Sequence, residues 1–244
     1  MMTAISELQD KIYSFSSLTP GILIKRYKRF LADVKLADGR IITVHCPNSG
    51  SMKGLAYPGA PVMLGYNPNP KRKYPFTWHL VQIEGVWVGI NTHLPNDLVE
   101  QALILGKIRL FPHIKTIERE VRYGEKTRFD FRITTAQDDI YYLEVKNVTL
   151  READQALFPD AITQRGTRHL QDLAQISRTG GKAVSFYLVQ RADCTSFGIA
   201  AHIDPLYYTA YQKAREEGVQ TLCYACHVDP NGIELGQELP VKDL

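Results

Sequence analysis

Two neighbouring segments carry charged residues within an otherwise apolar pair of strands. They are residues 128–132 and 140–146, and turn-forming residues at positions 136–139 separate them. Each segment alternates aromatic or β-branched residues with polar ones, which predicts a strand. Residues i and i+2 of a strand point to the same face, so Glu144 and Lys146 should project together, with Asp130 on the strand alongside. The sequence therefore predicts two carboxylates and one ammonium on one face of a sheet.

Two interpretations of this charged group stay open. It forms either a surface ion pair on a solvated strand or a site within a mostly buried strand. The heavily apolar neighbours favour the buried strand. Buried charges need a compensating partner such as a metal ion, so the second interpretation predicts a site with chemistry.

The order Asp130, then Glu144-Val145-Lys146, resembles the motif of PD-(D/E)xK, or restriction-endonuclease-like, nucleases. The whole chain is similar to the bacterial sugar fermentation stimulation protein A family. This broader resemblance rests on residues 47–52, 98–103, 129–131, 144–148 and 158–161, together with Arg165-Gly166 and His169-Leu170. It implies an N-terminal OB-fold domain, a C-terminal nuclease-like domain and DNA binding, and it leaves open whether the chain cleaves DNA.

The chain of 244 residues fits one large domain or two small ones, and we place a boundary near residues 91–95. Residues 1–95 carry 11 Lys and Arg against 5 Asp and Glu, whereas residues 96–244 carry 18 against 21. A basic first half suits a polyanionic partner, and an acidic second half suits a metal site. We predict a mixed α/β protein: an OB-fold-like β-barrel that binds nucleic acid over residues 1–92, then a restriction-endonuclease-like α/β domain with a central mixed sheet over residues 93–244.

About five short strands are expected in the first domain, which suits a small closed barrel or sandwich. They cover residues 22–36, 42–46, 61–66, 76–83 and 86–90. The loop at 67–74 contains Lys71, Arg72, Lys73 and Tyr74, and cations beside an aromatic ring are what oligonucleotides bind. The basic segment 25–29 fits the same role. The alternative is that these cations are only solvated. The loop at 47–54 is either a phosphate-binding loop or a plain structural one.

The second domain should combine helices with a mixed sheet. A helix from Asn96 or Asp97 to about Gly106 carries Glu100, and a second helix runs from Asp160 or Thr163 to about Arg178. We expect strands over residues 117–123, 127–134, 140–145, 182–190, 197–202 and 219–228, a helix over 205–217, and a polar loop over 149–160.

The nuclease resemblance implies a divalent metal at Asp130 and Glu144. Mg²⁺ or Mn²⁺ prefers oxygen ligands, so these two carboxylates and the Val145 carbonyl suffice. Lys146 is expected to act electrostatically on phosphate charge, because neighbouring carboxylates favour a charged ammonium. Glu100 is a candidate for a further metal or water ligand, since many similar nucleases carry an acid on the helix before the sheet. Its alternative role is a favourable charge near a helix N-terminus.

Three residues of the second helix complete the predicted site. Arg165, Arg168 and His169 recur at helical spacing, so several of them can face the strand acids together. We expect them to contact nucleic-acid phosphates, because the planar fork of Arg binds pairs of oxygens.

The predicted function is a DNA-binding protein with a Mg²⁺- or Mn²⁺-dependent nuclease site that acts on DNA or RNA. The alternative is a non-catalytic DNA-binding regulator of sugar-metabolism genes that keeps the nuclease fold as a scaffold. A sugar-phosphate enzyme has no supporting motif, since the sequence has neither a Gly-rich phosphate loop nor a Rossmann fingerprint. The oligomeric state is open, with a homodimer among the alternatives.

Composition and termini predict a cytoplasmic protein with no membrane partner. The sequence has no export-signal pattern and no apolar run of roughly 20 residues, so its four Cys are expected to be reduced. Cys223-Tyr-Ala-Cys226-His227 matches a haem attachment pattern. Its surroundings alternate like a strand, however, and residues i and i+3 of a strand face opposite sides. We therefore interpret both as buried core cysteines.

Overall fold

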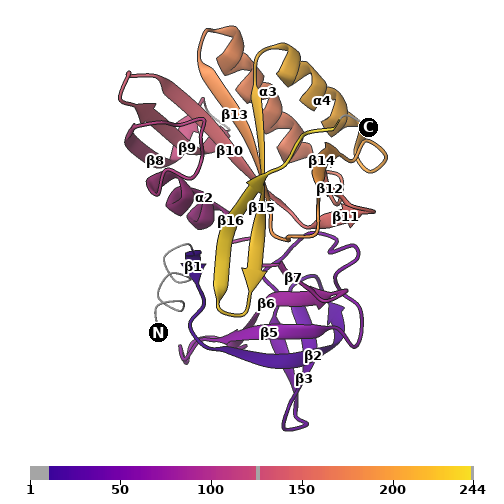
Figure 1. The fold of residues 1–244 in the computed structure, drawn as a ribbon. Coiled ribbons are helices and arrows are strands. Elements are labelled where there is room, and N and C mark those ends of the chain that lie inside the picture. Colours follow the sequence, from indigo (N-terminus) through magenta and orange to yellow (C-terminus); the bar gives the residue numbers. More distant parts are fainter. Residues whose placement is uncertain (1–10, 125–126, 243–244) are drawn as a thin grey trace.

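The computed structural model describes residues 11–124 and 127–242, and Figure 1 shows two regions with separate sheets. Strands β2 to β7 form the lower region in this view, and the helices cover the larger sheet above it. No helix in the described ranges has the length and apolar composition needed to cross a membrane.

The first region is a six-stranded sheet that closes on itself. Its order is β4-β3-β2-β5-β6-β7, and His45 of β4 also pairs with Thr77 of β6. Alternate residues point into the enclosed core, as Ala32 and Val34 do, and the core contains the fully buried Trp78. The strands are β2 (Leu18–Tyr27), β3 (Leu31–Leu36), β4 (Ile41–His45), β5 (Pro61–Tyr66), β6 (Phe76–Ile83) and β7 (Val86–Gly89).

The single strand predicted over residues 22–36 is wrong, because the chain turns in its middle. β2 and β3 form a hairpin in which Tyr27 pairs with Leu31. Lys28 and Arg29 have φ angles of 48° and 59°, the left-handed conformation found in tight hairpin turns. Gly or Asn usually marks such a turn, and neither occurs between Tyr27 and Leu31, so the local sequence carries no clear signal for it.

The second region is built on a seven-stranded mixed sheet in the order β1-β16-β15-β13-β10-β9-β8. β10, β13 and β15 run parallel at its centre, and β13 is buried from residue 183 to 189, as a strand covered on both faces requires. The strands are β1 (Lys11–Ser14), β8 (Ile114–Tyr123), β9 (Thr127–Thr135), β10 (Ile140–Val148), β13 (Lys182–Val189), β15 (Gln220–Asp229) and β16 (Gly232–Glu238).

The described helices cover both faces of this sheet. α3 (Gln164–Arg178) and α4 (Pro205–Glu216) pack on one face, and α2 (Pro95–Ile104) packs on the other. The side chain of Thr163 caps α3 by accepting from the backbone N–H of Gly166, and that of Asp204 caps α4 by accepting from Tyr207. The structure thus selects Thr163 over Asp160 as the start of α3, and α4 begins at residue 205 as predicted.

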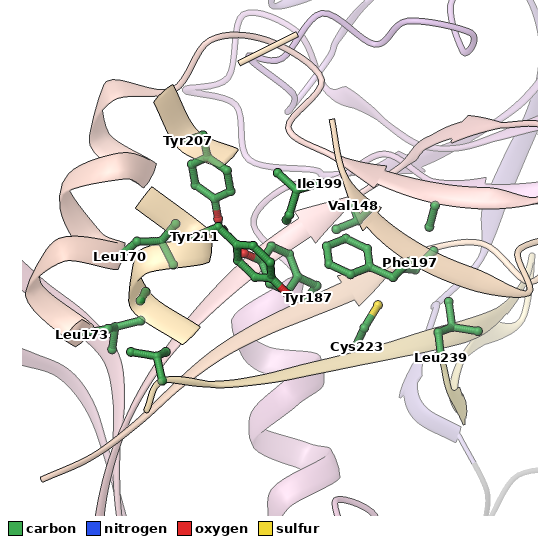
Figure 2. Close-up of a cluster of buried hydrophobic side chains, with 14 of the residues drawn as sticks. Val148, Leu170, Leu173, Tyr187, Phe197, Ile199, Tyr207, Tyr211, Cys223 and Leu239 are labelled. Atoms are coloured by element: carbon green, nitrogen blue, oxygen red, sulfur yellow. Dashed lines mark hydrogen bonds between the residues drawn. The ribbon is translucent and has the colours of Figure 1, made fainter. Parts of the chain in front are cut away.

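Figure 2 shows the core between the sheet and helices α3 and α4. Tyr187 of β13 points toward Tyr207 of α4, and their hydroxyl groups form a 2.7 Å hydrogen bond. Both side chains are fully buried, where a hydroxyl without a partner would cost about 1–3 kcal/mol. Cys223 lies in this core, whereas Cys226 lies in the core on the other face. The prediction that their sulfurs diverge is confirmed.

The polar loop predicted at residues 149–160 is wrong. This segment contains β11 (Leu150–Glu152) and β12 (Gln155–Phe158), which join β14 (Ser196–Ile199) in a three-stranded sheet. Leu150 and Leu157 form a buried cluster with Ala200. The partner strand β14 comes from far along the chain. The charged residues at 151–154 therefore predicted a loop, although pairing with a distant segment stabilises a strand here.

Strand β16 lies beyond residue 228, where the last main strand was predicted to end. It follows a turn in which Asp229 Oδ1 accepts from the backbone N–H groups of Asn231 (2.5 Å) and Gly232 (3.0 Å). Asn-Gly is a strong hairpin signal, so this strand could have been predicted. β16 then pairs with β1.

The loop at residues 47–53 is held by hydrogen bonds at the junction of the two regions. Arg26 donates to the carbonyls of Asn48 (2.8 Å) and Gly50 (2.9 Å), and Ser51 Oγ donates to Asp160 Oδ2 (3.0 Å). These contacts favour the structural alternative for this loop, and they occupy Arg26 of the basic segment 25–29.

A second junction contact lies next to the charged strand β10. The backbone N–H of Gly89 donates to the carbonyl of Gln190 (2.9 Å), and Gln190 Nε2 donates to Asn147 Oδ1 (2.6 Å). A Cβ at position 89 would lie 2.4 Å from Gln190 Oε1. Only glycine leaves room for this contact, which anchors the first region directly beside Lys146.

We expect Gly89→Ala to lower the free energy of unfolding by about 1–3 kcal/mol, because overpacking a buried contact forces side chains to shift. The cost should be smaller in a Gln190→Ala background, where the clashing amide is gone. Urea unfolding of the wild type, the two single variants and the double variant measures both costs. Equal costs in both backgrounds would contradict this account of the junction.

Candidate active site

Asp130 lies where β9 separates from β10. The antiparallel pairing of these strands ends at Phe131 and Leu143. Beyond this pair, the backbone N–H of Val145 donates to Asp130 Oδ2 (2.7 Å), where a regular ladder would use a backbone carbonyl. Asn96 Nδ2 of α2 donates to Oδ1 (2.7 Å). Both carboxylate oxygens are thus held at the opening between the two strands.

Strand β9 changes face at Asp130. Phe129 belongs to the core on the α3 side, whereas Phe131 belongs to the core on the α2 side. In a regular strand these two residues would share a face. Glu120, opposite Asp130 in the β8–β9 ladder, has a positive φ of 53°. The break in the alternation of β9 therefore lies opposite an irregular backbone position of β8.

Glu144 of β10 is only 4% exposed and is held from two sides. Its Oε1 accepts from Lys146 Nζ (2.5 Å), and His169 Nδ1 of α3 lies within hydrogen-bond distance of the same oxygen. Its Oε2 is buried and has no hydrogen-bond partner among the described residues. One oxygen of this buried carboxylate is therefore saturated by protein groups, while the other has room for a further partner.

The two carboxylates have opposite pKa shifts. Burial, followed by the charge of Glu144, raises the pKa of Asp130 to about 6, against the lowering effects of Val145 and Lys146. Burial also acts to raise the pKa of Glu144, but the charge of Lys146 and the hydrogen bonds from Lys146 and His169 outweigh it and hold this pKa below its usual value. At neutral pH Glu144 is therefore ionised, while Asp130 titrates close to physiological pH.

His169 lies inside the protein and not on the phosphate-facing surface that was predicted for it. Its side chain is 2% exposed, and its Nε2 accepts from Arg165 Nε one turn earlier (3.3 Å). An accepting Nε2 assigns the proton to Nδ1, which then donates to Glu144. His169 therefore positions Glu144, whereas Arg165 and Arg168 are exposed on the same helix.

Glu100 does not join the strand carboxylates in an acidic cluster. Its Oε2 accepts from Arg119 Nη1 (3.0 Å), and the same guanidinium binds Asp97 (2.8 Å). Within residues 11–124 and 127–242, no group of three or more His, Cys, Asp or Glu side chains is arranged as a metal site. The structure brings together Asp130, Glu144 and Lys146, and leaves Glu100 in an ion pair with β8.

The predicted basic loop lies apart from these residues, on the first region. Lys71 and Lys73 are exposed, and Lys73 Nζ lies 5.5 Å from the centre of the Tyr74 ring. Arg72 is partly buried, with Nη1 3.4 Å from Thr77 Oγ1. The loop thus exposes two cations, with the half-buried Tyr74 ring beside one of them, and keeps Arg72 partly buried.

The hydrogen bond of Asn96 to Asp130 was not predicted, whereas the helical spacing did predict that residues of α3 would face the strand acids, as His169 does. Asn96 was considered only as a helix cap, and it lies instead in the first turn of α2. The burial of His169 could have been predicted, because it shares the helical spacing of the buried residues Gly166, Leu170 and Leu173.

Two family models match successive parts of the chain. The model described as "SfsA N-terminal OB domain" matches residues 24–90, and "Sugar fermentation stimulation protein RE domain" matches residues 93–232. Among curated proteins, the chain is 49% identical over 225 residues to the sugar fermentation stimulation protein homolog of Geotalea uraniireducens, over 92% of this chain and 97% of that one. It is 46% identical over 230 residues to the homolog of Roseobacter denitrificans, over 93% and 98% of the two chains.

Among solved structures, the fold is similar to that of Pyrococcus furiosus SfsA in complex with Ca²⁺. The TM-score is 0.87 at 24% sequence identity, over 95% of this chain and 99% of that one. Together with the family models, this similarity confirms the predicted fold class, an OB domain followed by an α/β domain with a mixed sheet.

The raised pKa of Asp130 predicts a measurable pH dependence of stability in metal-free protein. The folded value, about 6, exceeds the ordinary 3.8, so ionising Asp130 weakens the folded state. This penalty is absent below pH 3.8, grows as the pH rises and is complete above about pH 6. Asp130→Asn should therefore gain stability relative to the wild type across this interval, by about 2–3 kcal/mol.

Urea unfolding in a chelating buffer at several pH values measures this difference. The matched control is Asp38→Asn. Asp38 is an exposed turn aspartate whose pKa is lowered by hydrogen bonds from Arg40. The free energy of unfolding of Asp38→Asn, relative to the wild type, should therefore not rise as the pH rises. A difference between Asp130→Asn and the wild type that stays constant from acidic to neutral pH would contradict the prediction.

Proposed function

Because the chain belongs to the sugar fermentation stimulation protein family, we propose that it binds nucleic acid and that its RE domain hydrolyses phosphodiester bonds of DNA or RNA with Mg²⁺ or Mn²⁺. The proposal rests on one observation above all. A buried carboxylate, Glu144, has one oxygen saturated by Lys146 and His169, while the other has no partner among the described residues, and its charge acts on the neighbouring Asp130.

The residues present fit a divalent cation. The charge of Glu144 raises the cost of ionising Asp130, and a bound cation would offset that cost. Hard divalent cations take oxygen ligands, which here would be the two carboxylates and the Val145 carbonyl, without Glu100. Pyrococcus furiosus SfsA forms a complex with Ca²⁺, another cation with this preference. When bound, the metal would neutralise phosphate charge and favour ionisation of water.

Lys146 is the group proposed to act on the reacting phosphate. Hydrolysis forms a bond from the water oxygen to phosphorus, breaks the bond from phosphorus to the leaving oxygen of the strand, and delivers a proton to that oxygen. Negative charge on the phosphate oxygens redistributes during this exchange. The Lys146 ammonium, held at Glu144 in a largely buried position, is preorganised to stabilise that charge. His169 and Arg165 behind Glu144 keep its carboxylate in place.

Nucleic-acid binding is proposed for two exposed basic surfaces. Lys71, Lys73 and Tyr74 combine cations with a ring on which a base can stack. Arg165 and Arg168 lie on the first turns of α3, the helix that carries the partner of Glu144. Phosphate contacts of this kind position a strand without reading its sequence.

We expect Lys146→Ala to lower single-turnover cleavage of a labelled oligonucleotide by about 10²- to 10³-fold in Mn²⁺, with metal and nucleic-acid binding nearly unchanged. The carboxylates hold the metal, whereas the ammonium acts mainly on charge in the transition state. Asp130→Asn should instead abolish metal-dependent cleavage, because it removes a proposed metal ligand. Lys182→Ala is the matched control, because Lys182 is an exposed, ion-paired lysine of the neighbouring strand.

Three results of this assay decide between the alternatives. Cleavage abolished only in the site variants supports the nuclease. Equal cleavage by wild type and Lys146→Ala would assign the activity to another site or to a contaminant. Failure of the wild type to cut any DNA or RNA in Mg²⁺ or Mn²⁺ would favour a non-catalytic DNA-binding regulator.

The exposed lysines of the loop should contribute to the salt dependence of binding. Each cation that binds a phosphate adds roughly 0.7 to 0.9 to the steepness of log K against log salt. Lys71→Ala with Lys73→Ala should therefore flatten the slope. The control is a double variant with the same charge change, Lys115→Ala with Lys182→Ala, at two lysines engaged by acids. An unchanged slope in the loop variant would remove this loop from the interface.

A further inference from the structure

A polar cleft of about 310 Å³ lies where the first region meets β1 and the segment leading to α2, and neither Asp130 nor Glu144 lines it. It is bounded by the connection from β1 to β2, by the ends of β4 and β5, by β6, and by the segment leading to α2. Its volume is at the lower end of the range for small-molecule sites. The nitrogen-bearing side chains that line it are Arg72, His45, His79, His93, Asn67 and Asn91.

The chemistry of this cleft suits an anion. None of the described residues that line it is an aspartate or a glutamate, and Arg72 supplies a permanent positive charge. His45 Nδ1 is buried and has no hydrogen-bond partner among the described residues, so it has capacity for a ligand. Among the described residues, the Arg72 guanidinium makes only a long, 3.4 Å hydrogen bond to Thr77 Oγ1. A guanidinium and imidazoles without opposing carboxylates are the groups that bind phosphate oxygens.

The cleft is built by close packing. A Cβ at Gly65 of β5 would lie 2.7 Å from His79 Nε2, so glycine makes room for this imidazole. The ring of Phe15 packs edge-on against His79, with centroids 5.5 Å apart. Asn91 Nδ2 lies 3.3 Å from His79 Nδ1. His79 is therefore held in one orientation and not left as a mobile surface side chain.

We propose that this cleft binds a phosphate group of a nucleic-acid strand, as a site separate from the carboxylates of β9 and β10. The proposal rests on the nucleic-acid binding proposed above. It also assigns Arg72 a role that Lys71 and Lys73 do not share, since these two exposed lysines do not line the cleft.

The cleft lies near the candidate active site along the chain. His93 lines the cleft, and Asn96, three residues later, donates to Asp130. Three residues span at most about 10–11 Å between Cα atoms. A phosphate in the cleft and a phosphate at the carboxylates can therefore belong to one strand, with few nucleotides between them.

Bound phosphate should change the titration of the histidines. Burial, then the charge of Arg72, lowers the pKa of His79 to about 4, and burial, Arg72 and His93 lower the pKa of His45. The other titratable groups that line the cleft are Tyr13 and Tyr66. An anion beside these imidazoles favours their protonated forms, so binding should raise both pKa values by about one unit or more.

The test is a titration of the histidine ring signals by NMR, on the full chain in a chelating buffer that prevents cleavage. The probes are a single-stranded oligothymidylate, thymidine 5′-monophosphate and inorganic phosphate at equal phosphate concentration. We expect the oligothymidylate to raise the pKa of His45 and His79. Arg72→Gln should raise both values before any probe is added, which shows that the cleft is folded, and should abolish the response. Lys73→Gln, a matched variant of the same loop, should keep it.

Other results would overturn the proposal. No response of either histidine to the oligothymidylate would mean that the cleft is a structural feature. A response to inorganic phosphate or thymidine 5′-monophosphate alone would identify a site for a free anion. An unchanged response in Arg72→Gln would remove Arg72 from the site. Because metal is absent, these results are independent of whether the RE domain cleaves, so the two proposals can fail separately.

Discussion

The burial of Glu144 is the constraint on which the site depends. Removing an ionised carboxylate from water costs several kcal/mol unless charged and hydrogen-bonded partners compensate. Lys146 compensates from the same strand and His169 from α3, and both act on the same oxygen. α3 must therefore lie close over β10, and the second oxygen stays without a partner among the described residues. Packing of the core and geometry of the site are thus set by the same contacts.

The position of α3 depends in turn on Asp204, which is itself buried. One of its oxygens accepts from the backbone N–H of Tyr207 at the start of α4, and the other accepts from the N–H of Thr163 at the start of α3. The hydroxyl contact of Tyr207 with Tyr187 then holds α4 against β13 (Figure 2). The Asp204 carboxylate therefore links the starts of the two helices, and the contact of α4 with β13 fixes both against the sheet. This positions His169 relative to Glu144.

The sequence predicted what depends on local periodicity and missed what depends on distant contacts. The shared face of Glu144 and Lys146 follows from the period of two along β10, and the caps at Thr163 and Asp204 are local hydrogen bonds. The direction of Asp130 depends instead on a break in the alternation of β9, opposite the left-handed Glu120, which no local pattern encodes. β12 likewise needs a partner, β14, from far along the chain. The burial of His169 was missed for a different reason: its helical spacing with the buried residues Leu170 and Leu173 was not considered.

The junction of the two regions determines how the first region is positioned relative to the candidate active site in the second. Gly89 and Gln190 meet through backbone and buried groups, and Gln190 reaches Asn147, the neighbour of Lys146. On the other side of the junction, the segment from His93 to Asn96 leads from the polar cleft to Asp130. Because these contacts are short and partly buried, the first region is held against the site and not tethered by a flexible linker. A nucleic-acid strand bound to the first region would therefore reach Asp130 and Glu144 in a fixed register. Rigid positioning would then raise the effective concentration of its phosphates at these carboxylates.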